Sequence, residues 1–176
     1  MVCSPRKSFP AALKAAFPHT VPILTGYLAV GLAFLKRRRT TLSTGCPIPA
    51  LPVEQFAALL PFSPTDAQRR TMAEAARDMA SGRPMNRLVQ GDVGSGKTVV
   101  AAYAGWLAVQ GGFQAAMMAP TEVLAEQHFR TLSALLSPAG ARVALPTGAI
   151  TAAQMRTVHP ALAQGGIDLV VGTHAL

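Results

Sequence analysis

The octapeptide Gly91–Thr98 (Gly-Asp-Val-Gly-Ser-Gly-Lys-Thr) has the residue types and spacing that bind phosphate groups. It fits the P-loop pattern, in which two glycines separated by four residues precede a lysine and a serine or threonine. Glycine adopts backbone angles that a Cβ would forbid, so consecutive N–H groups can point into one concavity. Lys97 is expected to reach the β- and γ-phosphates, and the Thr98 hydroxyl to bind Mg²⁺. The predicted nucleotide-binding residues of this loop are Gly91, Asp92, Val93, Gly94, Ser95, Gly96, Lys97 and Thr98.

The sequence on either side of this loop predicts the setting that the motif requires. Residues 86–90 (Asn-Arg-Leu-Val-Gln) are typical of a short buried strand that leads into the loop. Residues 97–110 are mostly apolar and predict a helix, which Gly111 and Gly112 would end. A strand, a loop and a helix in this order support a phosphate-binding function over an ordinary glycine-rich turn.

Upstream of the loop, the pattern predicts a short helix over 53–60 and a longer helix ending near Ala80. Ser63 is expected to cap the longer helix, with Pro64 at its first position and Asp66 three residues after the cap. Gly82 and Pro84 follow the expected end of this helix.

Downstream of the loop, predicted strands and helices alternate. Strands are expected over 113–119, 142–145 and 167–171, with a helix over 121–136 and a helical stretch over 151–164 that Pro160 interrupts. Alternation at this spacing indicates a parallel sheet with helices on both faces. The strands are continuously apolar, which fits burial on both faces. The predicted fold class is therefore α/β.

The 176 residues have the length of one ordinary domain and a formal charge of +8. Residues 1–40 contain seven Lys or Arg and no Asp or Glu, whereas residues 41–176 contain nine basic and eight acidic residues. This basic N-terminal segment can bind a polyanion such as nucleic acid, or it can be a solvated charge run. Cys3 and Cys46 lack metal or redox spacing and fit a reducing cytosol, so a cytoplasmic location is expected.

The apolar run Val21–Leu35 precedes four basic residues but is only fifteen residues long. A membrane span needs about 20 apolar residues, so a buried helix over 27–39 is favoured and a membrane anchor remains the alternative. Residues 40–52 contain three prolines and read as a linker. The predicted division is an N-terminal segment over 1–52 and a nucleotide-binding part over 53–176.

Several blocks of the sequence resemble the RecG family of bacterial ATP-dependent DNA helicases, which belongs to helicase superfamily 2 and remodels stalled replication forks. The blocks are 60–68, 84–90, Gly91–Thr98, 118–128 and 170–176, in the order and spacing of the family. The resemblance covers about 51–176 and extends to the helix over 27–39. It implies an incomplete RecA-like motor domain that uses ATP and Mg²⁺. The chain also resembles transcription-repair coupling factor, which shares this type of motor. This resemblance ranks second, because that protein usually has phenylalanine at the position of Ser95 and a different second motif.

The resemblance also implies roles for residues outside the loop. Gln68 would recognise the adenine of ATP. Residues at strand ends would hold the backbone of branched or forked DNA without reading its sequence. These predicted DNA contacts are Pro120, Thr121, Thr147, Gly148 and Thr173. Pro146 departs from the family pattern, in which a threonine or another small residue usually precedes Thr147.

The family's second acidic motif, Asp-Glu-Gln-His, and its second motor domain are not found in the sequence. Asp168 lies inside a predicted strand and is not accepted as the missing Mg²⁺ ligand. We therefore expect a fragment of the first motor domain that binds ATP weakly and does not hydrolyse it. The alternative is a stand-alone nucleotide- or nucleic-acid-binding module.

Overall fold

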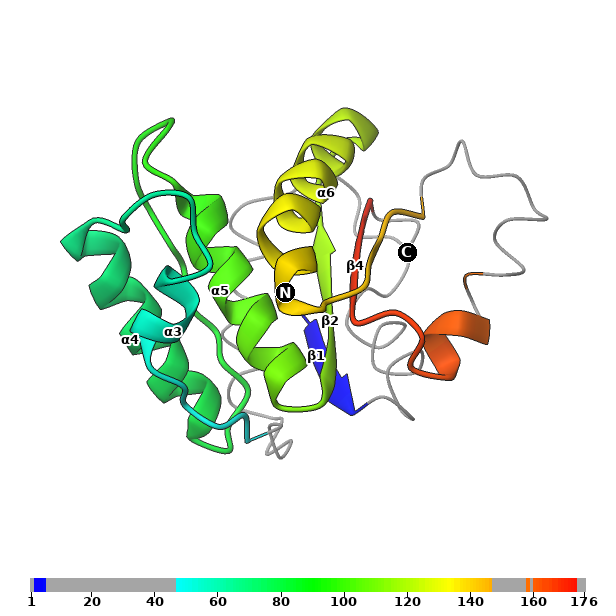
Figure 1. Cartoon of the computed structure of the whole chain (residues 1–176), viewed down its shortest axis with the longest axis horizontal. Coiled ribbons are helices and arrows are strands. Elements are labelled where there is room, and N and C mark those ends of the chain that lie inside the picture. Colours follow the sequence, from blue (N-terminus) through cyan, green and yellow to red (C-terminus); the bar gives the residue numbers. More distant parts are fainter. Residues whose placement is uncertain (1, 6–46, 147–157, 159, 174–176) are drawn as a thin grey trace, which may run out of the picture.

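The computed structural model describes residues 2–5, 47–146, 158 and 160–173, which form a four-stranded sheet flanked by helices (Figure 1). The strands are β1 (Val2–Pro5), β2 (Phe113–Met118), β3 (Val143–Ala144) and β4 (Leu169–Gly172). Their order across the sheet is β1-β2-β4-β3. Strands β2, β4 and β3 are parallel, and β1 pairs with β2 in the antiparallel direction. This sheet confirms the predicted α/β class.

The helices confirm most of the expected elements. Those predicted over 97–110 and 121–136 are present, and the helix that ends at Ala80 is present with a later start. Residues 160–163 are helical, but 147–157 and the helix expected over 27–39 lie outside the described residues. The helices are α3 (Val53–Ala57), α4 (Asp66–Ala80), α5 (Lys97–Gln110) and α6 (Glu122–Leu136), with the 3₁₀ turn η1 (Ser137–Ala139) after α6.

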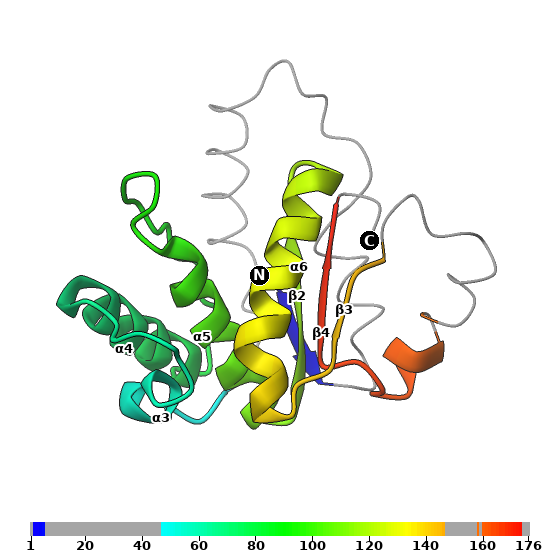
Figure 2. The ribbon, with the colours of Figure 1, turned by 45° about the horizontal axis from the view of Figure 1, so that its top comes forward.

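Both faces of the sheet are covered by helices, as predicted. Ala115 of β2 and Leu169 of β4 belong to the main hydrophobic core, which α4, α5 and α6 share. The next residue of each strand, Ala116 and Val170, packs on the opposite face against Leu162 in the short helical stretch. Figures 1 and 2 show α5 and α6 side by side over one face, with α4 outside α5. Side chains of β2 and β4 therefore alternate between two buried layers.

The strand predicted over 86–90 is wrong. These residues have no regular structure, and Leu88 is 81% exposed. A strand needs a neighbour to satisfy its backbone groups, and no described strand lies beside this segment. The guanidinium of Arg87 instead binds Glu74 and Asp78, which holds the segment against α4.

The predicted cap of α4 is also wrong. Thr65 is the N-cap, so Ser63 and Pro64 precede the helix and Asp66 is its first residue. The Gln68 N–H donates to Thr65 Oγ1 at 3.3 Å, and the Thr65 N–H donates to Gln68 Oε1 at 2.9 Å. This reciprocal capping box requires Glu or Gln three residues after the cap. Three residues after Ser63 stands Asp66, whose side chain is shorter than that of Gln68. Thr65 with Gln68 therefore forms the better cap.

Candidate nucleotide and nucleic-acid site

The loop Gly91–Thr98 has the backbone that the glycine pattern predicted. Gly94 and Gly96 have φ angles of 82° and 78°, which favour glycine. Gly96 is the N-cap of α5, so the first helical residues are Lys97 and Thr98. The first N–H groups of a helix lack intrahelical acceptors, and the helix dipole favours an anion beside them. The loop and the start of α5 therefore form a potential phosphate site.

The Lys97 ammonium lies over the loop. Its Nζ donates hydrogen bonds of 2.7 Å to the carbonyl oxygens of Gly91 and Asp92. The side chain is thus already folded toward the residues that would surround a phosphate. An ammonium, the Thr98 hydroxyl and the amides at a helix start are donors and ligands that suit a nucleotide phosphate with Mg²⁺.

Gln68 connects α4 to this loop. Its Nε2 donates to the Ser95 carbonyl oxygen at 2.9 Å, while its Oε1 accepts from the Thr65 N–H. A Cβ on Gly96 would lie 2.3 Å from Gln68 Nε2, so this contact requires a glycine there. Sequence reasoning missed the contact between Gln68 and the loop. Adenine recognition by Gln68 stays a prediction.

Two of the predicted DNA-binding segments meet at the carboxyl edge of the sheet. Met118 of β2 pairs with Gly172 of β4, and the Ala119 N–H donates to the Gly172 carbonyl oxygen at 2.8 Å. This pairing brings the segment containing Pro120 and Thr121 beside Thr173. Figure 1 shows the loop before α5 and the arrowhead of β2 at the same end of the molecule. Ligands of open α/β sheets bind at this edge.

Among the predicted DNA contacts that the structure describes, Thr121 has an accessible hydroxyl. Thr121 is exposed and caps α6, since its Oγ1 accepts from the Leu124 N–H at 3.3 Å. Thr173 is only 8% exposed. Thr147 and Gly148 lie outside the described residues. The nucleic-acid roles of all these residues stay predictions.

Asp168 lies at the opposite edge of the sheet, directly before β4. It is 3% exposed and accepts hydrogen bonds from Arg142 Nε at 2.8 Å and from Arg142 Nη2 at 2.9 Å. The Arg142 backbone N–H also donates to Asp168 Oδ2 at 2.9 Å. The hydrogen bond to Asp168 raises the pKa of Arg142. This position agrees with the exclusion of Asp168 as a Mg²⁺ ligand. The strand predicted over 167–171 begins later than expected, at Leu169 of β4.

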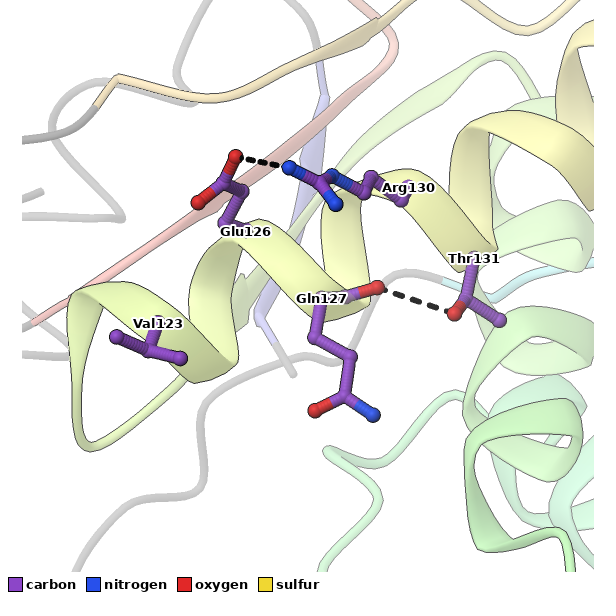
Figure 3. Close-up of a pocket in the computed structure, with 5 residues that line it drawn as sticks. All are labelled: Val123, Glu126, Gln127, Arg130 and Thr131. Atoms are coloured by element: carbon purple, nitrogen blue, oxygen red, sulfur yellow. Dashed lines mark hydrogen bonds and ion pairs between the residues drawn. The ribbon is translucent and has the colours of Figure 1, made fainter.

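A shallow hollow follows Thr121 along the outer surface of α6 (Figure 3). Arg130 pairs with Glu126 one turn earlier, and the Thr131 hydroxyl donates to the Gln127 carbonyl oxygen at 3.0 Å. The side-chain amide of Gln127 points away from the ion pair in Figure 3. Exposed pairs of this spacing are weak, so both charges remain accessible to a ligand.

Residues 65–176 match the DEAD/DEAH box helicase family. The chain belongs to this family. It is 52% identical over 124 residues to ATP-dependent DNA helicase RecG of Synechocystis sp., an alignment that covers 70% of this chain and 15% of the relative. RecG of Streptococcus pneumoniae is 53% identical over 117 residues, or 66% of this chain and 17% of the relative. RecG of Mycobacterium tuberculosis is 44% identical over 165 residues, an alignment that covers 84% of this chain and 22% of the relative.

The identity of 44–53% to these proteins named RecG, together with the helicase family match, confirms the resemblance to RecG drawn from the sequence blocks. The chain spans between 15 and 22% of the length of these three relatives. The matched region of this helicase-family chain contains the loop, Gln68 and the strand-end residues. Within the described ranges, no helix has the length and apolar character that crossing a membrane requires. The segment Val21–Leu35 lies outside those ranges.

Proposed function

We propose that this chain provides the ATP-binding and strand-contacting part of an ATP-dependent DNA helicase of the RecG type. The observation that carries the proposal is the Lys97 ammonium over a glycine loop at the start of α5, in a chain of the DEAD/DEAH box helicase family. The relatives named RecG support DNA as the partner. We also propose branched or forked DNA as the substrate and the cytoplasm as the location.

Lys97 is the main phosphate-binding group in this proposal. Its Nζ exchanges the carbonyl oxygens of Gly91 and Asp92 for oxygens of the β- and γ-phosphates, which form stronger charge-assisted hydrogen bonds. Backbone N–H groups from Gly94 to Thr98 surround the same phosphates, and the Thr98 hydroxyl is a Mg²⁺ ligand. Bound Mg²⁺·ATP would supply the free energy for movement along DNA.

Gln68 recognises adenine in this proposal. One N–H of its amide is bonded to the Ser95 carbonyl oxygen, and the second is available for a base edge. Because the same side chain contacts the loop, the position of the base and the position of the phosphates are linked through one residue. This arrangement supports selection of ATP at the loop.

Thr121 is the principal DNA contact that the geometry supports. Its hydroxyl and the N–H groups at the start of α6 can bind a backbone phosphate, and such contacts carry no sequence information. Pro120 would position this turn, while Thr147, Gly148 and Thr173 would extend the contact along the strand. Contacts of this type allow movement along DNA of any sequence.

Hydrolysis requires a carboxylate that holds Mg²⁺ and a group that stabilises the transition state. We assign neither role to a described residue. We therefore propose that the part over 53–176 binds ATP, that 1–52 connects it to a DNA-binding domain, and that turnover needs a second motor domain.

The nucleotide part of the proposal is tested by titrating the chain into a fluorescent ATP analogue with Mg²⁺. Lys97→Ala should weaken binding by about 10- to 100-fold, because hydrogen bonds to charged groups contribute about 1.5–3 kcal/mol. Arg83→Ala removes an exposed charge outside the loop and serves as the control. Equal affinity of the wild type and Lys97→Ala would overturn the assignment.

The DNA part is tested separately with a labelled single-stranded oligonucleotide. Thr121→Ala removes the hydroxyl and should weaken binding, whereas Thr121→Ser keeps the hydroxyl and should retain it. Both variants should bind the ATP analogue like the wild type. Loss of binding in both variants, or in neither, would contradict a role for the hydroxyl.

A further inference from the structure

A second groove lies beside α4. It holds about 560 Å³ and is bordered by residues 50–54, by α4 and by Tyr103 of α5. The Tyr103 hydroxyl donates to the Leu51 carbonyl oxygen at 2.7 Å, which holds the 50–54 segment across α5. Leu51, Pro52, Ala73 and Ala76 add further apolar atoms to the lining. The groove therefore has an apolar floor that a ligand can cover.

The rim of this groove is basic. Arg70 and Arg77 lie seven residues apart on α4, which places them about 10 Å apart along the helix axis. Both residues are exposed, and neither guanidinium has a hydrogen-bond or ion-pair partner among residues 47–146, 158 and 160–173. Arg69 lies at one end, where its Nη1 is 3.7 Å from Glu54 Oε1. A ligand that fits this groove therefore needs anionic groups for the two guanidinium groups and an apolar face for the floor.

Neither the chain's own N-terminal segment nor a second copy suits this groove. Residues 6–46 contain no Asp or Glu, so they bring no charge that complements the rim. The carboxylates of Glu54, Glu74, Asp78, Glu126 and Asp168 are already paired with arginines of their own chain. Asp66 and Asp92 lie on separate elements, so they do not form a pair seven residues apart on one helix. A ligand that brings its own carboxylates fits better.

A nucleic-acid backbone also fits poorly. A phosphodiester backbone has no apolar face to cover Leu51, Pro52 and Ala73. An amphipathic peptide can place an apolar face on the floor and carboxylates beside the arginines.

We propose that this groove binds an acidic amphipathic segment of a partner protein. The segment carries carboxylates about 10 Å apart, which pair with Arg70 and Arg77, and its apolar side chains lie over Pro52 and Ala73. This site is separate from the nucleotide loop, and it does not depend on the proposed helicase function.

The test is fluorescence anisotropy with the full chain and a labelled peptide. The peptide has leucines at i, i+3, i+4 and i+7 and glutamates seven residues apart. A peptide with lysine in place of each glutamate and an oligothymidine of equal length are the comparison ligands. We expect the acidic peptide to bind. The double variant Arg70→Glu/Arg77→Glu should weaken binding by about tenfold or more, since two attractive pairs become repulsive.

Two further variants separate the groove from general charge effects. Arg83→Glu reverses an exposed charge outside the groove and should leave the affinity within about twofold. Ala73→Trp fills the floor without changing charge and should also weaken binding. The circular dichroism spectrum of each variant should match the wild type. The proposal is overturned if the acidic peptide does not bind at about 1 mM, if Arg83→Glu has the same effect as the double variant, or if oligothymidine displaces the peptide.

Discussion

Replacing Gly96 by alanine should destabilise the chain more than the same change at Gly94, although both residues have similar backbone angles. Their φ angles are 78° and 82°, so alanine is strained to a similar degree at either position. The surroundings differ. A Cβ at Gly94 has nothing within 4 Å, whereas a Cβ at Gly96 would lie 2.3 Å from Gln68 Nε2.

The expected magnitudes follow from these contacts. Alanine in the left-handed region costs about 1–2 kcal/mol, and this is the whole effect expected of Gly94→Ala. In Gly96→Ala the Gln68 amide must also leave the Ser95 carbonyl oxygen, which adds about 1 kcal/mol. We therefore expect Gly96→Ala to lower the free energy of unfolding by about 2–3 kcal/mol.

The assay is urea unfolding followed by circular dichroism for the wild type, Gly94→Ala, Gly96→Ala, Gln68→Ala and the double variant Gly96→Ala/Gln68→Ala. Without the Gln68 amide, alanine at position 96 meets no clash. The double-mutant cycle should therefore give a coupling free energy of about 1 kcal/mol between positions 96 and 68. Gly94→Ala combined with Gln68→Ala should be additive.

Equal destabilisation by the two glycine variants would refute this reasoning. So would a coupling free energy of zero between positions 96 and 68, because the contact of Gln68 with the loop would then contribute nothing. A coupling as large for Gly94 as for Gly96 would show a general change in the loop and not a local clash.

Two further predictions concern the scaffold. Arg142→Ala removes the hydrogen bonds of a half-exposed guanidinium to the buried Asp168 carboxylate and should cost about 1.5–3 kcal/mol in urea unfolding. Arg130→Ala breaks an exposed pair and should cost about 0.5 kcal/mol or less, so equal effects of the two variants would contradict this difference. Burial, assisted by the nearby carboxylate of Glu54, raises the pKa of the Tyr103 hydroxyl. The raised pKa contributes stability that is present below about pH 10 and lost as pH rises through the folded-state pKa. The free energy of unfolding should therefore fall more steeply above pH 10 in the wild type than in Tyr103→Phe, and parallel curves would contradict this.

The elements that sequence patterns predicted well depend on local signals. The start of α5 follows from Gly96 and Lys97, and the start of α6 follows from Thr121, because glycine conformation and capping act within a few residues. The hydrophobic run of β2 was equally clear. The glycine pattern and the helix start after it were therefore enough to predict the loop and its place before α5.

The features that were missed depend on distant residues or on competing signals. A strand over 86–90 requires a second strand to pair with, and the sequence of 86–90 alone does not show whether such a strand lies beside it. Ser63 and Thr65 are both suitable caps two residues apart, and the Gln68 side chain decides between them. The contact of Gln68 with Ser95 joins positions 27 residues apart, so no local pattern reports it.

The central claim is that Gly91–Thr98 binds the phosphates of ATP. Amide hydrogen exchange of the full chain, with and without Mg²⁺·ATP, tests it at the residues concerned. The account predicts that exchange slows at the amides from Gly94 to Thr98 and that Lys97→Ala abolishes this protection at the same ATP concentration. Unchanged exchange in this loop at an ATP concentration that protects other parts of the chain would contradict the account.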